Sequence, residues 1–326
     1  MTYKLGVIGT SWITSQFVEA AQEKNQFSLT AVYSRHLESG QRLVDEFGQG
    51  TAFTDLEQFL SSDIDVVYIA SPNSLHFSQT KAALLHRKNV ICEKPAVADP
   101  AQLNEIKEIL EADSEIFYFE AQRNLYDPNI NIIKDLQEQI GTIDGASLTY
   151  MKRSSKFGAV EKGELPNVFS TEFAGGALYD LGVYAVAFAV EQFGKPQKAF
   201  YDAKMLDIDH GSDIFGLGLL KYPDFSVEIK IGKSVTSYAP TEIYGEKGTI
   251  IITNPADLTE VKLARSSKEI ENLSLPTQSN PLSYEANSFY WTMYRNDRIQ
   301  MFEQFEKTIA VSRILKEMRD CAGIVF

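Results

Sequence analysis

The first 120 residues alternate short apolar runs with helical patterns, and this alternation limits the possible folds more than any other feature of the sequence. The runs are rich in β-branched and aromatic residues and predict buried strands at 3–9, 27–34, 65–70, 89–92 and 115–119. Between them, apolar residues recur at helical spacing over 38–47, 78–86 and 100–110. Strands that alternate with helices form βαβ crossovers, so we expect residues 1–120 to form a doubly wound parallel sheet.

The rest of the chain, residues 121–326, has a different pattern and predicts a second domain. Its strands follow one another in series, at 143–152, 199–207, 214–221, 226–231, 241–245, 249–253 and 261–265. Short connections favour hairpins, and therefore an α/β domain with a large open antiparallel sheet. One helix is expected over 176–193, and an apolar stripe indicates a last helix over 309–322. The segment 254–281 is polar and turn-rich.

Composition and charge exclude several classes of partner. With 31 basic and 44 acidic residues the net charge is −13, which argues against nucleic acid or an anionic membrane as the main partner. No run of 18 apolar residues occurs and the first residues lack the layout of a signal peptide, so no membrane span is expected. With two cysteines and four histidines we expect no metal site, and reduced thiols fit a cytoplasmic protein.

The loop after the first strand stands where a parallel sheet binds dinucleotides. The fingerprint there is G-x-G-x-x-G/A, whereas this sequence has G-x-S-x-x-T, so the loop is either an ordinary βα turn or a cofactor loop. In the second case the cofactor contacts come from Gly9, Thr10, Ser11, Trp12 and Ile13. Ser11 then either turns its hydroxyl to a phosphate oxygen or keeps the cofactor further out. The second outcome is favoured if the turn needs a positive φ.

At the end of the second predicted strand, Ser34 and Arg35 stand where an NAD site usually has an acid on the ribose hydroxyls. A hydroxyl and a guanidinium suit a phosphate instead, because arginine binds phosphate oxygens in a bidentate fork. The alternative is a solvated surface arginine. The missing acid favours NADP over NAD as the cofactor.

Two distant segments carry the residues best suited to catalysis. The first comprises SPNSLH at 71–76 and Glu93-Lys94-Pro95, each after a predicted strand and at the edge where ligands bind. Lys94 either meets a substrate there or pairs with an acid on the surface. The second, AGGALYDLGVY at 174–184, places Asp180 and Tyr184 on one face of a helix. Tyr184 is otherwise a core tyrosine, and Asp180 an acid in the first helical turn.

These segments resemble the Gfo/Idh/MocA oxidoreductases. The resemblance rests on IGTSWIT, VYSR, YIASPNSLH, EKP, GGALYDLGVY and ILKEMRDCAGIVF, in the family's order over nearly the whole chain. The D-x-G-x-Y form is most similar to the branch that holds dihydrodiol dehydrogenases and NADP-dependent D-xylose dehydrogenases. The resemblance implies a Rossmann domain and a second α/β domain whose last helix returns to the first. It also implies cofactor contacts from Ser71, Pro72, Asn73, His76, Glu93 and Lys94.

By the same resemblance, Lys94 and Tyr184 meet at the reacting oxygen, and Tyr184 is the acid/base. An ammonium nearby would favour the ionised form of a phenol. Asp180 orients Lys94 or a substrate hydroxyl. The expected activity is hydride transfer between NADP or NAD and a carbinol or carbonyl carbon of a sugar, diol or related small polyol.

Two other functions stay open. A non-catalytic NAD(P)-binding sensor of the same fold would bind the cofactor without turnover. A lyase or glycosidase with an internal redox cycle would show no net change in NADPH. The open sheet presents a large face, so we expect a homodimer or homotetramer formed through it.

Overall fold

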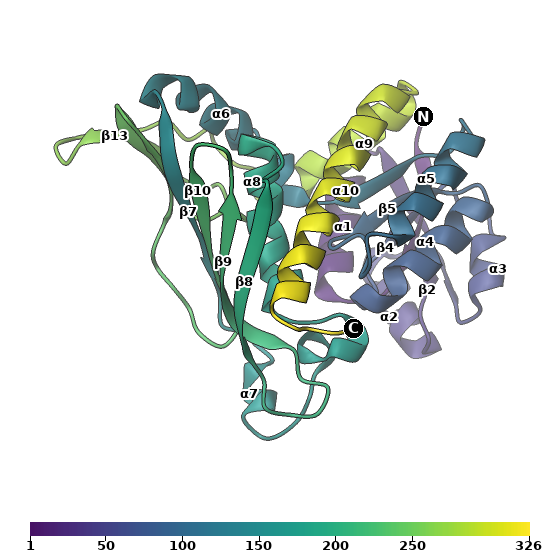
Figure 1. Cartoon of the computed structure of the whole chain (residues 1–326). Coiled ribbons are helices and arrows are strands. Elements are labelled where there is room, and N and C mark those ends of the chain that lie inside the picture. The colour runs from purple at the N-terminus through teal and green to yellow at the C-terminus, as the bar shows by residue number, and fades with distance from the viewer. The chain divides into compact units, whose positions relative to one another are not determined.

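The computed structural model describes residues 1–326, which divide into two compact units (Figure 1). The first consists of Met1–Arg123 with Gln278–Ile309, and the second of Asn124–Thr277 with Ala310–Phe326. The first boundary lies close to the expected one at residue 120. The first unit differs from the expected division, however, because it also takes in a segment from near the end of the chain.

A six-stranded parallel sheet forms the core of the first unit, in the order β3-β2-β1-β4-β5-β6. Its strands are β1 (Tyr3–Ile8), β2 (Phe27–Tyr33), β3 (Thr51–Phe53), β4 (Val66–Ile69), β5 (Asn89–Glu93) and β6 (Tyr118–Ala121). Every neighbouring pair is parallel, which confirms the expected doubly wound sheet. β3 is an addition to the expected strands, and β6 begins at Tyr118 rather than at Glu115. The order reverses at β1, so the ligand-binding crevice of such a sheet lies at the loop after β1.

Helices cover the strands of this unit. They are α1 (Trp12–Gln22), α2 (Leu37–Phe47), α3 (Leu56–Leu60), η1 (Asn73–Leu75), α4 (His76–Leu85), α5 (Gln102–Ala112), α9 (Leu282–Tyr294) and the first half of α10 (Arg298–Cys321). The late segment of the chain supplies α9, which packs against α1. Phe289 of α9 stacks on Phe119 of β6 with a centroid distance of 4.7 Å. This contact anchors the returning chain to the edge of the sheet.

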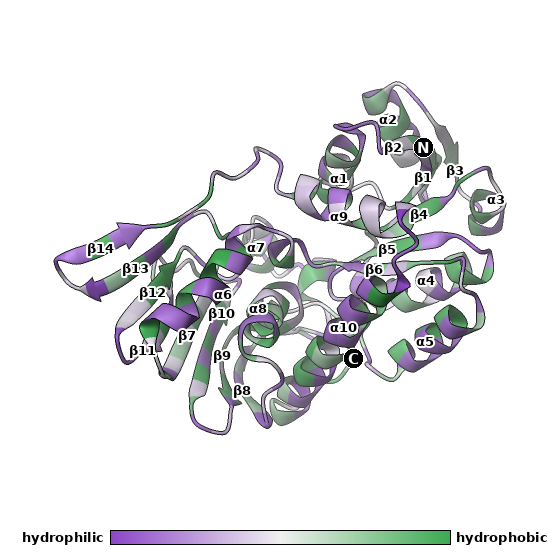
Figure 2. Ribbon diagram, turned by 90° about the horizontal axis from the view of Figure 1, so that it is seen from above, coloured by the Kyte–Doolittle hydropathy of each residue, from purple (hydrophilic) through white to green (hydrophobic).

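An eight-stranded sheet forms the second unit, in the order β14-β13-β12-β11-β7-β10-β9-β8. Its strands are β7 (Ile143–Met151), β8 (Lys198–Met205), β9 (Asp213–Lys221), β10 (Ser226–Gly232), β11 (Thr241–Gly245), β12 (Gly248–Ile252), β13 (Val261–Ser266) and β14 (Glu269–Asn272). All pairs are antiparallel except β10 with β7, so the sheet is mixed at one position. The hairpins expected at β9–β10 and β11–β12 are confirmed. The β13–β14 hairpin, largely hydrophilic in Figure 2, adds one strand to those expected.

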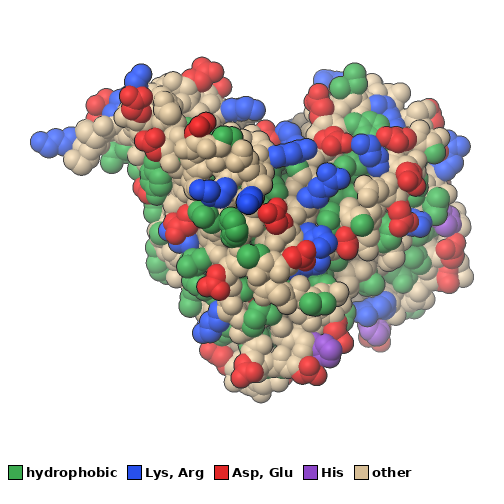
Figure 3. Space-filling view, viewed as in Figure 1, with side chains coloured by type: hydrophobic (Ala, Val, Ile, Leu, Met, Phe, Trp, Pro, Cys, Tyr) green, Lys and Arg blue, Asp and Glu red, His purple; other side chains and the backbone are tan.

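One face of this sheet is covered and the other is open. The cover consists of α6 (Asn129–Ile140), a π-helical turn η5 (Leu178–Gly182), α8 (Val183–Phe193) and the second half of α10, from Ala310 onward. Shorter helices are η2 (Arg123–Leu125), α7 (Phe157–Val160), η3 (Asn167–Phe169) and η4 (Thr171–Phe173). In β9, buried and exposed residues alternate over most of the strand, as expected when only one face of a sheet is packed. In Figure 3, acidic and basic side chains are interspersed with hydrophobic ones on the visible surface.

By length and composition, Thr171–Phe193 resembles a membrane-crossing helix, although the sequence contains no unbroken apolar run of that length. Of its most apolar window, 89% is buried inside the protein. A core helix of a globular protein meets the same criteria, so this run is weak evidence for a membrane span.

Candidate active site

The turn after β1 approaches the loop after β4 closely. Gly9 has a φ of +102°, and a Cβ built there would lie 2.5 Å from the carbonyl oxygen of Ala70. Both facts exclude a side chain at this position. The chain then enters α1, whose first turn holds no acidic residue. The first N–H groups of an α-helix lack intrahelical partners, and with the helix dipole they suit a phosphate anion.

Ser11 is the N-cap of α1, with φ −84° and ψ 169°, and its side chain makes no capping hydrogen bond. This extended backbone is open to any residue, so the suggestion that the turn needs a positive φ is wrong. The exposed Trp12 follows, while Thr10 and Ile13 are half-buried. Thr14, at the third fingerprint position, is fully buried and its Oγ1 has no partner. The loop therefore fits a pyrophosphate, with the Ser11 hydroxyl as an additional donor.

Ser34 and Arg35 directly follow β2, at the carboxyl end of a strand that pairs with β1. The Ser34 N–H donates to the carbonyl of Phe53 at 3.0 Å, and its Oγ accepts from the His36 N–H at 3.4 Å. Arg35 is exposed, and no carboxylate pairs with its guanidinium. This is the arrangement expected of a residue that is available to an external phosphate.

His76 connects two of the segments that the sequence assigns to the cofactor. Its Nδ1 lies 2.8 Å from the carbonyl oxygen of Pro95, and its Nε2 lies 2.9 Å from that of Ser71. Burial lowers the pKa of His76, and the two carbonyl contacts oppose that shift. His76 therefore connects the loop after β4 to the segment after β5. That His76 also contacts a cofactor stays a prediction. Pro72 and Asn73 lie between Ser71 and His76 along the chain, at the start of η1.

Lys94 follows β5, is half-buried, and has a cis peptide bond to Pro95. The adjacent Glu93 is buried and accepts hydrogen bonds from Tyr68 Oη at 2.6 Å and from the Lys94 N–H at 3.3 Å. Burial raises the pKa of Glu93, and the charge of Lys94 is the largest influence opposing it. Glu93 is thus an internal neighbour of Lys94, and Lys94 is the more accessible member of the pair.

Two further buried acids lie in this unit, and no sequence motif marks them. Glu120 in β6 accepts from the Ala96 N–H at 2.9 Å, and burial raises its pKa to about 7. Glu285 in α9 is fully buried, and neither of its carboxyl oxygens has a partner. Burial, followed by the charge of Glu93, raises the pKa of Glu285 well above its ordinary value. The structure thus gathers acids near Glu93 that sequence reasoning missed.

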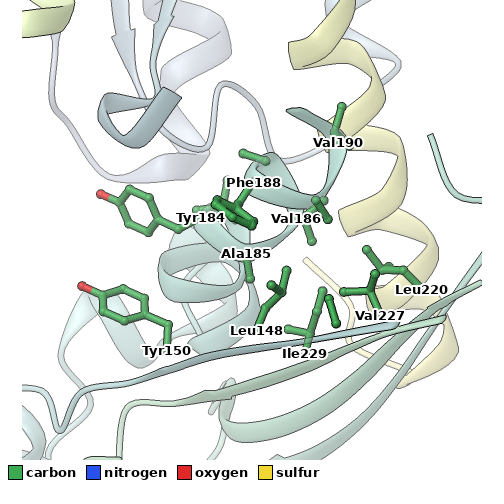
Figure 4. Packing of buried hydrophobic residues seen from close by; sticks show 14 of the residues in the cluster. Leu148, Tyr150, Tyr184, Ala185, Val186, Phe188, Val190, Leu220, Val227 and Ile229 are labelled. Atoms are coloured by element: carbon green, nitrogen blue, oxygen red, sulfur yellow. The ribbon is translucent and has the colours of Figure 1, made fainter. Parts of the chain in front are cut away.

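The second unit presents Asp180 and Tyr184 at the start of its buried helix. Asp180 lies in the π-helical turn η5, a kind of turn frequent at functional sites, and its side chain is 36% exposed. Tyr184 lies in the first turn of α8 and packs edge-to-face against Tyr150 of β7, with ring centroids 5.8 Å apart. In Figure 4 both phenol hydroxyls point the same way, out of the apolar cluster. Tyr150 therefore joins the candidate site, although no motif contains it.

Lys233, directly after β10, forms an ion pair with Asp180. Its Nζ lies 2.7 Å from Asp180 Oδ2 and donates to the carbonyl of Val168 at 2.8 Å. The sequence gives little sign of this residue, since it is a lysine that no motif contains and lies far from Asp180 along the chain.

Asp213 fixes the beginning of the same helix. Its Oδ2 accepts from the Leu178 N–H at 2.8 Å and from Tyr201 Oη at 2.6 Å. Burial raises the pKa of Asp213, and these two bonds oppose the rise. Gly176 has a φ of +121°, and a Cβ there would lie 2.1 Å from Asp213 Oδ1. The glycine in the motif is therefore required by a residue that lies outside the motif.

Each unit brings together part of the expected site. The first gathers Gly9, Ser11, Arg35 and Lys94 along the carboxyl edge of its sheet, and the second gathers Asp180 and Tyr184. That Lys94 meets Tyr184 stays a prediction. The fold and these groups define a class of protein, a dinucleotide-binding enzyme with a separate sheet-based unit that carries its own polar site.

Comparison with known proteins gives the family. The model of the oxidoreductase family with an NAD-binding Rossmann fold matches residues 3–121, and that of the GFO/IDH/MocA C-terminal domain matches residues 137–251. The uncharacterized oxidoreductase YgjR of Escherichia coli (strain K12) is 36% identical over 328 residues, covering 99% of this chain and 97% of that protein. The scyllo-inositol 2-dehydrogenase (NADP(+)) IolU of Bacillus subtilis (strain 168) is 34% identical over 325 residues, covering 99% and 98%. This chain belongs to the Gfo/Idh/MocA family of NAD(P)-dependent oxidoreductases.

Solved structures share the fold. The 3-ketoreductase KijD10 of Actinomadura kijaniata, in complex with NADP and TDP-benzene, matches with a TM-score of 0.85 at 20% identity, covering 98% of both chains. The branch suggested by the sequence is also represented, since the trans-1,2-dihydrobenzene-1,2-diol dehydrogenase of Homo sapiens is 24% identical over 343 residues, covering 100% of this chain and 98% of that protein. The expected fold and enzyme class are therefore confirmed.

Proposed function

We propose that this enzyme transfers a hydride between NADP(H) and a carbinol or carbonyl carbon of a sugar, diol or related small polyol. The observation that carries the proposal is the polar group of Asp180, Tyr184 and Tyr150 at the start of an otherwise apolar helix. Phenols and a carboxylate supply the hydrogen bonds that orient a substrate rich in hydroxyl groups. Two of the relatives support this class of substrate, because their names specify an inositol and a dihydrodiol.

In this proposal Tyr184 moves the proton of the reacting hydroxyl, and Lys94 stands beside it. The bound nicotinamide supplies the hydride donor or acceptor. An ammonium near the phenol favours the ionised form that can take a proton. In the reductive direction Tyr184 returns a proton to the substrate oxygen, and Lys94 offsets the negative charge that develops there. Asp180 accepts a hydrogen bond from a substrate hydroxyl.

The preference for NADP rests on Ser34 and Arg35. Arg35 is exposed and has no carboxylate partner, so it can bind a 2′-phosphate without first breaking an ion pair. The pyrophosphate would lie at the start of α1, against the backbone of Gly9 and the Ser11 hydroxyl. The loop after β1 and the first turn of α1 contain no acidic residue that would repel a phosphate.

The open face of the second sheet supports a proposed homodimer or homotetramer. Phe200 of β8 and Leu217 and Leu219 of β9 are large apolar residues that remain exposed on neighbouring strands. Burying such a face between copies of the chain is a common reason for association. Cys92 and Cys321 are both free thiols, which supports the proposal that the enzyme works in the reducing cytoplasm.

A fluorescence titration with NADPH and NADH, followed by a panel of inositols, aldoses and cyclic diols, tests the function. We expect tighter binding of NADPH and turnover of at least one polyol, with Tyr184→Phe as the matched inactive control. Cofactor binding without turnover of any member of the panel would contradict the proposal and favour a sensor.

A further inference from the structure

Lys233 is a buried lysine beside the polar group of the second unit. Its side chain is 2% exposed, and an ammonium removed from water is costly unless other partners replace the water. Three partners do so, namely Asp180 Oδ2 at 2.7 Å, the Val168 carbonyl at 2.8 Å and the ring of Phe169, whose centroid lies 4.6 Å away. The charge of Lys233 also opposes the rise in pKa that burial causes at Asp213. Lys233 is therefore held rigidly among groups that stabilise its charge.

The two carboxyl groups near Lys233 differ in exposure. Asp213 of β9 is internal, and both the Leu178 N–H and the Tyr201 hydroxyl of β8 donate to it. Asp180 of η5 keeps 36% of its side chain exposed although one of its oxygens contacts Lys233. Lys233 thus supports Asp180 from inside the protein while part of the same carboxylate remains accessible from outside. An internal charge with an accessible partner is the arrangement expected of a support for a substrate-binding group.

We propose that Lys233 is a positioning residue that keeps Asp180 aimed at the substrate hydroxyl next to the reacting carbon. The inference rests on the proposed function and adds a substrate class, molecules with two adjacent hydroxyl groups. Asp180 and Tyr184 lie four residues apart on neighbouring turns, so they can contact two neighbouring substrate oxygens. Without the ion pair to Lys233, the Asp180 side chain would rotate more freely and would hold the substrate hydroxyl less well.

The test compares Lys233→Met, which removes the charge and keeps most of the length, with the control Lys230→Met. Lys230 lies in β10 and pairs with Glu228 at 2.9 Å near the surface. Each protein is assayed with a polyol that wild type oxidises and with its deoxy analogue lacking the adjacent hydroxyl. We expect Lys233→Met to raise KM for the polyol about tenfold or more, the scale of a charge-assisted hydrogen bond. For the analogue kcat/KM should stay within about twofold. Equal losses on both substrates, or no change on either, would overturn the proposal.

The same comparison in an Asp180→Asn background shows whether Lys233 acts through Asp180. There Lys233→Met should change KM by less than about twofold, because the carboxylate it supports is already absent. A further large rise in KM would overturn the proposal. The double variant Asp180→Asn/Lys233→Met removes both members of the ion pair, so neither charge is left without its partner. Its KM can therefore be compared with that of Asp180→Asn even if Lys233→Met alone does not fold.

A measurement without substrate separates this proposal from the proposed function. In protein labelled with ¹³C at the aspartate carboxyl carbons, the Asp180 signal is identified by its loss in Asp180→Asn. We expect Asp180 to take up a proton at higher pH in Lys233→Met than in wild type or Lys230→Met. Coincident titrations would overturn the role of Lys233. If Asp180 takes up its proton at higher pH in Lys233→Met but the enzyme oxidises no polyol, the role of Lys233 is supported. In that case only the proposed function is overturned.

Discussion

Replacing Glu120 by glutamine should make the stability of the first unit less sensitive to rising pH. Glu120 lies in β6, is 7% exposed and accepts a hydrogen bond from the Ala96 N–H at 2.9 Å. Burial raises its pKa from an ordinary value of 4.5 to about 7, despite the opposing hydrogen bonds from Thr308 and Ala96. The folded protein therefore keeps this proton over a pH range in which the unfolded chain has lost it.

The sign and magnitude follow from proton linkage. A carboxyl with a raised pKa contributes stability that is fully present below the unfolded value of 4.5 and is lost as the pH rises through about 7. At about 1.4 kcal/mol for each pKa unit, this loss amounts to about 3 kcal/mol. Glutamine keeps a carbonyl oxygen for the Ala96 N–H and has no proton to lose. The unfolding free energy of the variant minus that of wild type should therefore rise by about 3 kcal/mol between about pH 4.5 and about pH 8.

Denaturant unfolding at a series of pH values measures this difference. Trp12 and Trp291 are the two tryptophans of the chain and both belong to the first unit, so their fluorescence follows the unit that contains Glu120. The other buried acids are present in both proteins and largely cancel in the difference. Glu111→Gln, an exposed acid in α5, is the matched control and should show no pH-dependent difference. A Glu120→Gln difference that stays constant with pH would mean that Glu120 is already ionised in the folded protein, and the reasoning would be refuted.

Three further predictions concern catalysis and cofactor binding. Tyr184→Phe and Lys94→Ala should each lower turnover by about 100-fold or more and change NADPH affinity far less, as steady-state rates and fluorescence titration would show. Normal turnover in Tyr184→Phe would exclude it as the acid/base. Arg35→Ala should weaken NADPH binding about tenfold or more without affecting NADH, because only NADPH carries the 2′-phosphate; wild-type protein that binds both equally would contradict this. Ser11→Gly should weaken NADPH binding about threefold in calorimetric titration, because it removes a hydroxyl that makes no capping bond from a backbone that needs no glycine. Tighter binding would show that the side chain obstructs the cofactor.

Hydrophobic periodicity predicts most strands of the two sheets, because the burial of a strand shows in the pattern of apolar residues along a few consecutive positions. β4 is buried along its whole length, and such a strand appears in the sequence as a continuous apolar run. The elements that sequence reasoning missed have other origins. β14 is fully exposed and is defined only by its pairing with β13. α9 contains several aromatic residues, which have no strong helical preference, and it is stabilised by packing on α1 and on Phe119.

In the candidate site, too, some residues follow from local sequence patterns and others reach the site only through the fold. Asp180 and Tyr184 are predictable because helical spacing alone places them on one face. The loop after β1 is predictable as a candidate cofactor loop because Gly9 follows a strand at the point where the strand order reverses. Lys233 and Tyr150 are not predictable in this way, since each reaches the site by strand order, and β7 lies next to β10 only in the folded sheet. The two contacts of the His76 ring with backbone carbonyl oxygens are likewise not predictable, because Pro95 comes near His76 only in the folded chain.

The start of the helix that carries Tyr184 shows that the motif depends on residues outside it. A helix that begins inside a protein core leaves N–H groups without partners, and each such buried group is costly. Asp213 satisfies one of them at Leu178, and Tyr201 donates to the same carboxyl oxygen. That carboxyl fits only because Gly176 has no Cβ. The polar residues that follow can then stand at the edge of the apolar core in fixed positions, with Lys233 supporting Asp180. Gly176 of the motif therefore makes room for the internal carboxyl of Asp213. That carboxyl in turn fixes the turn from which Asp180 and Tyr184 project.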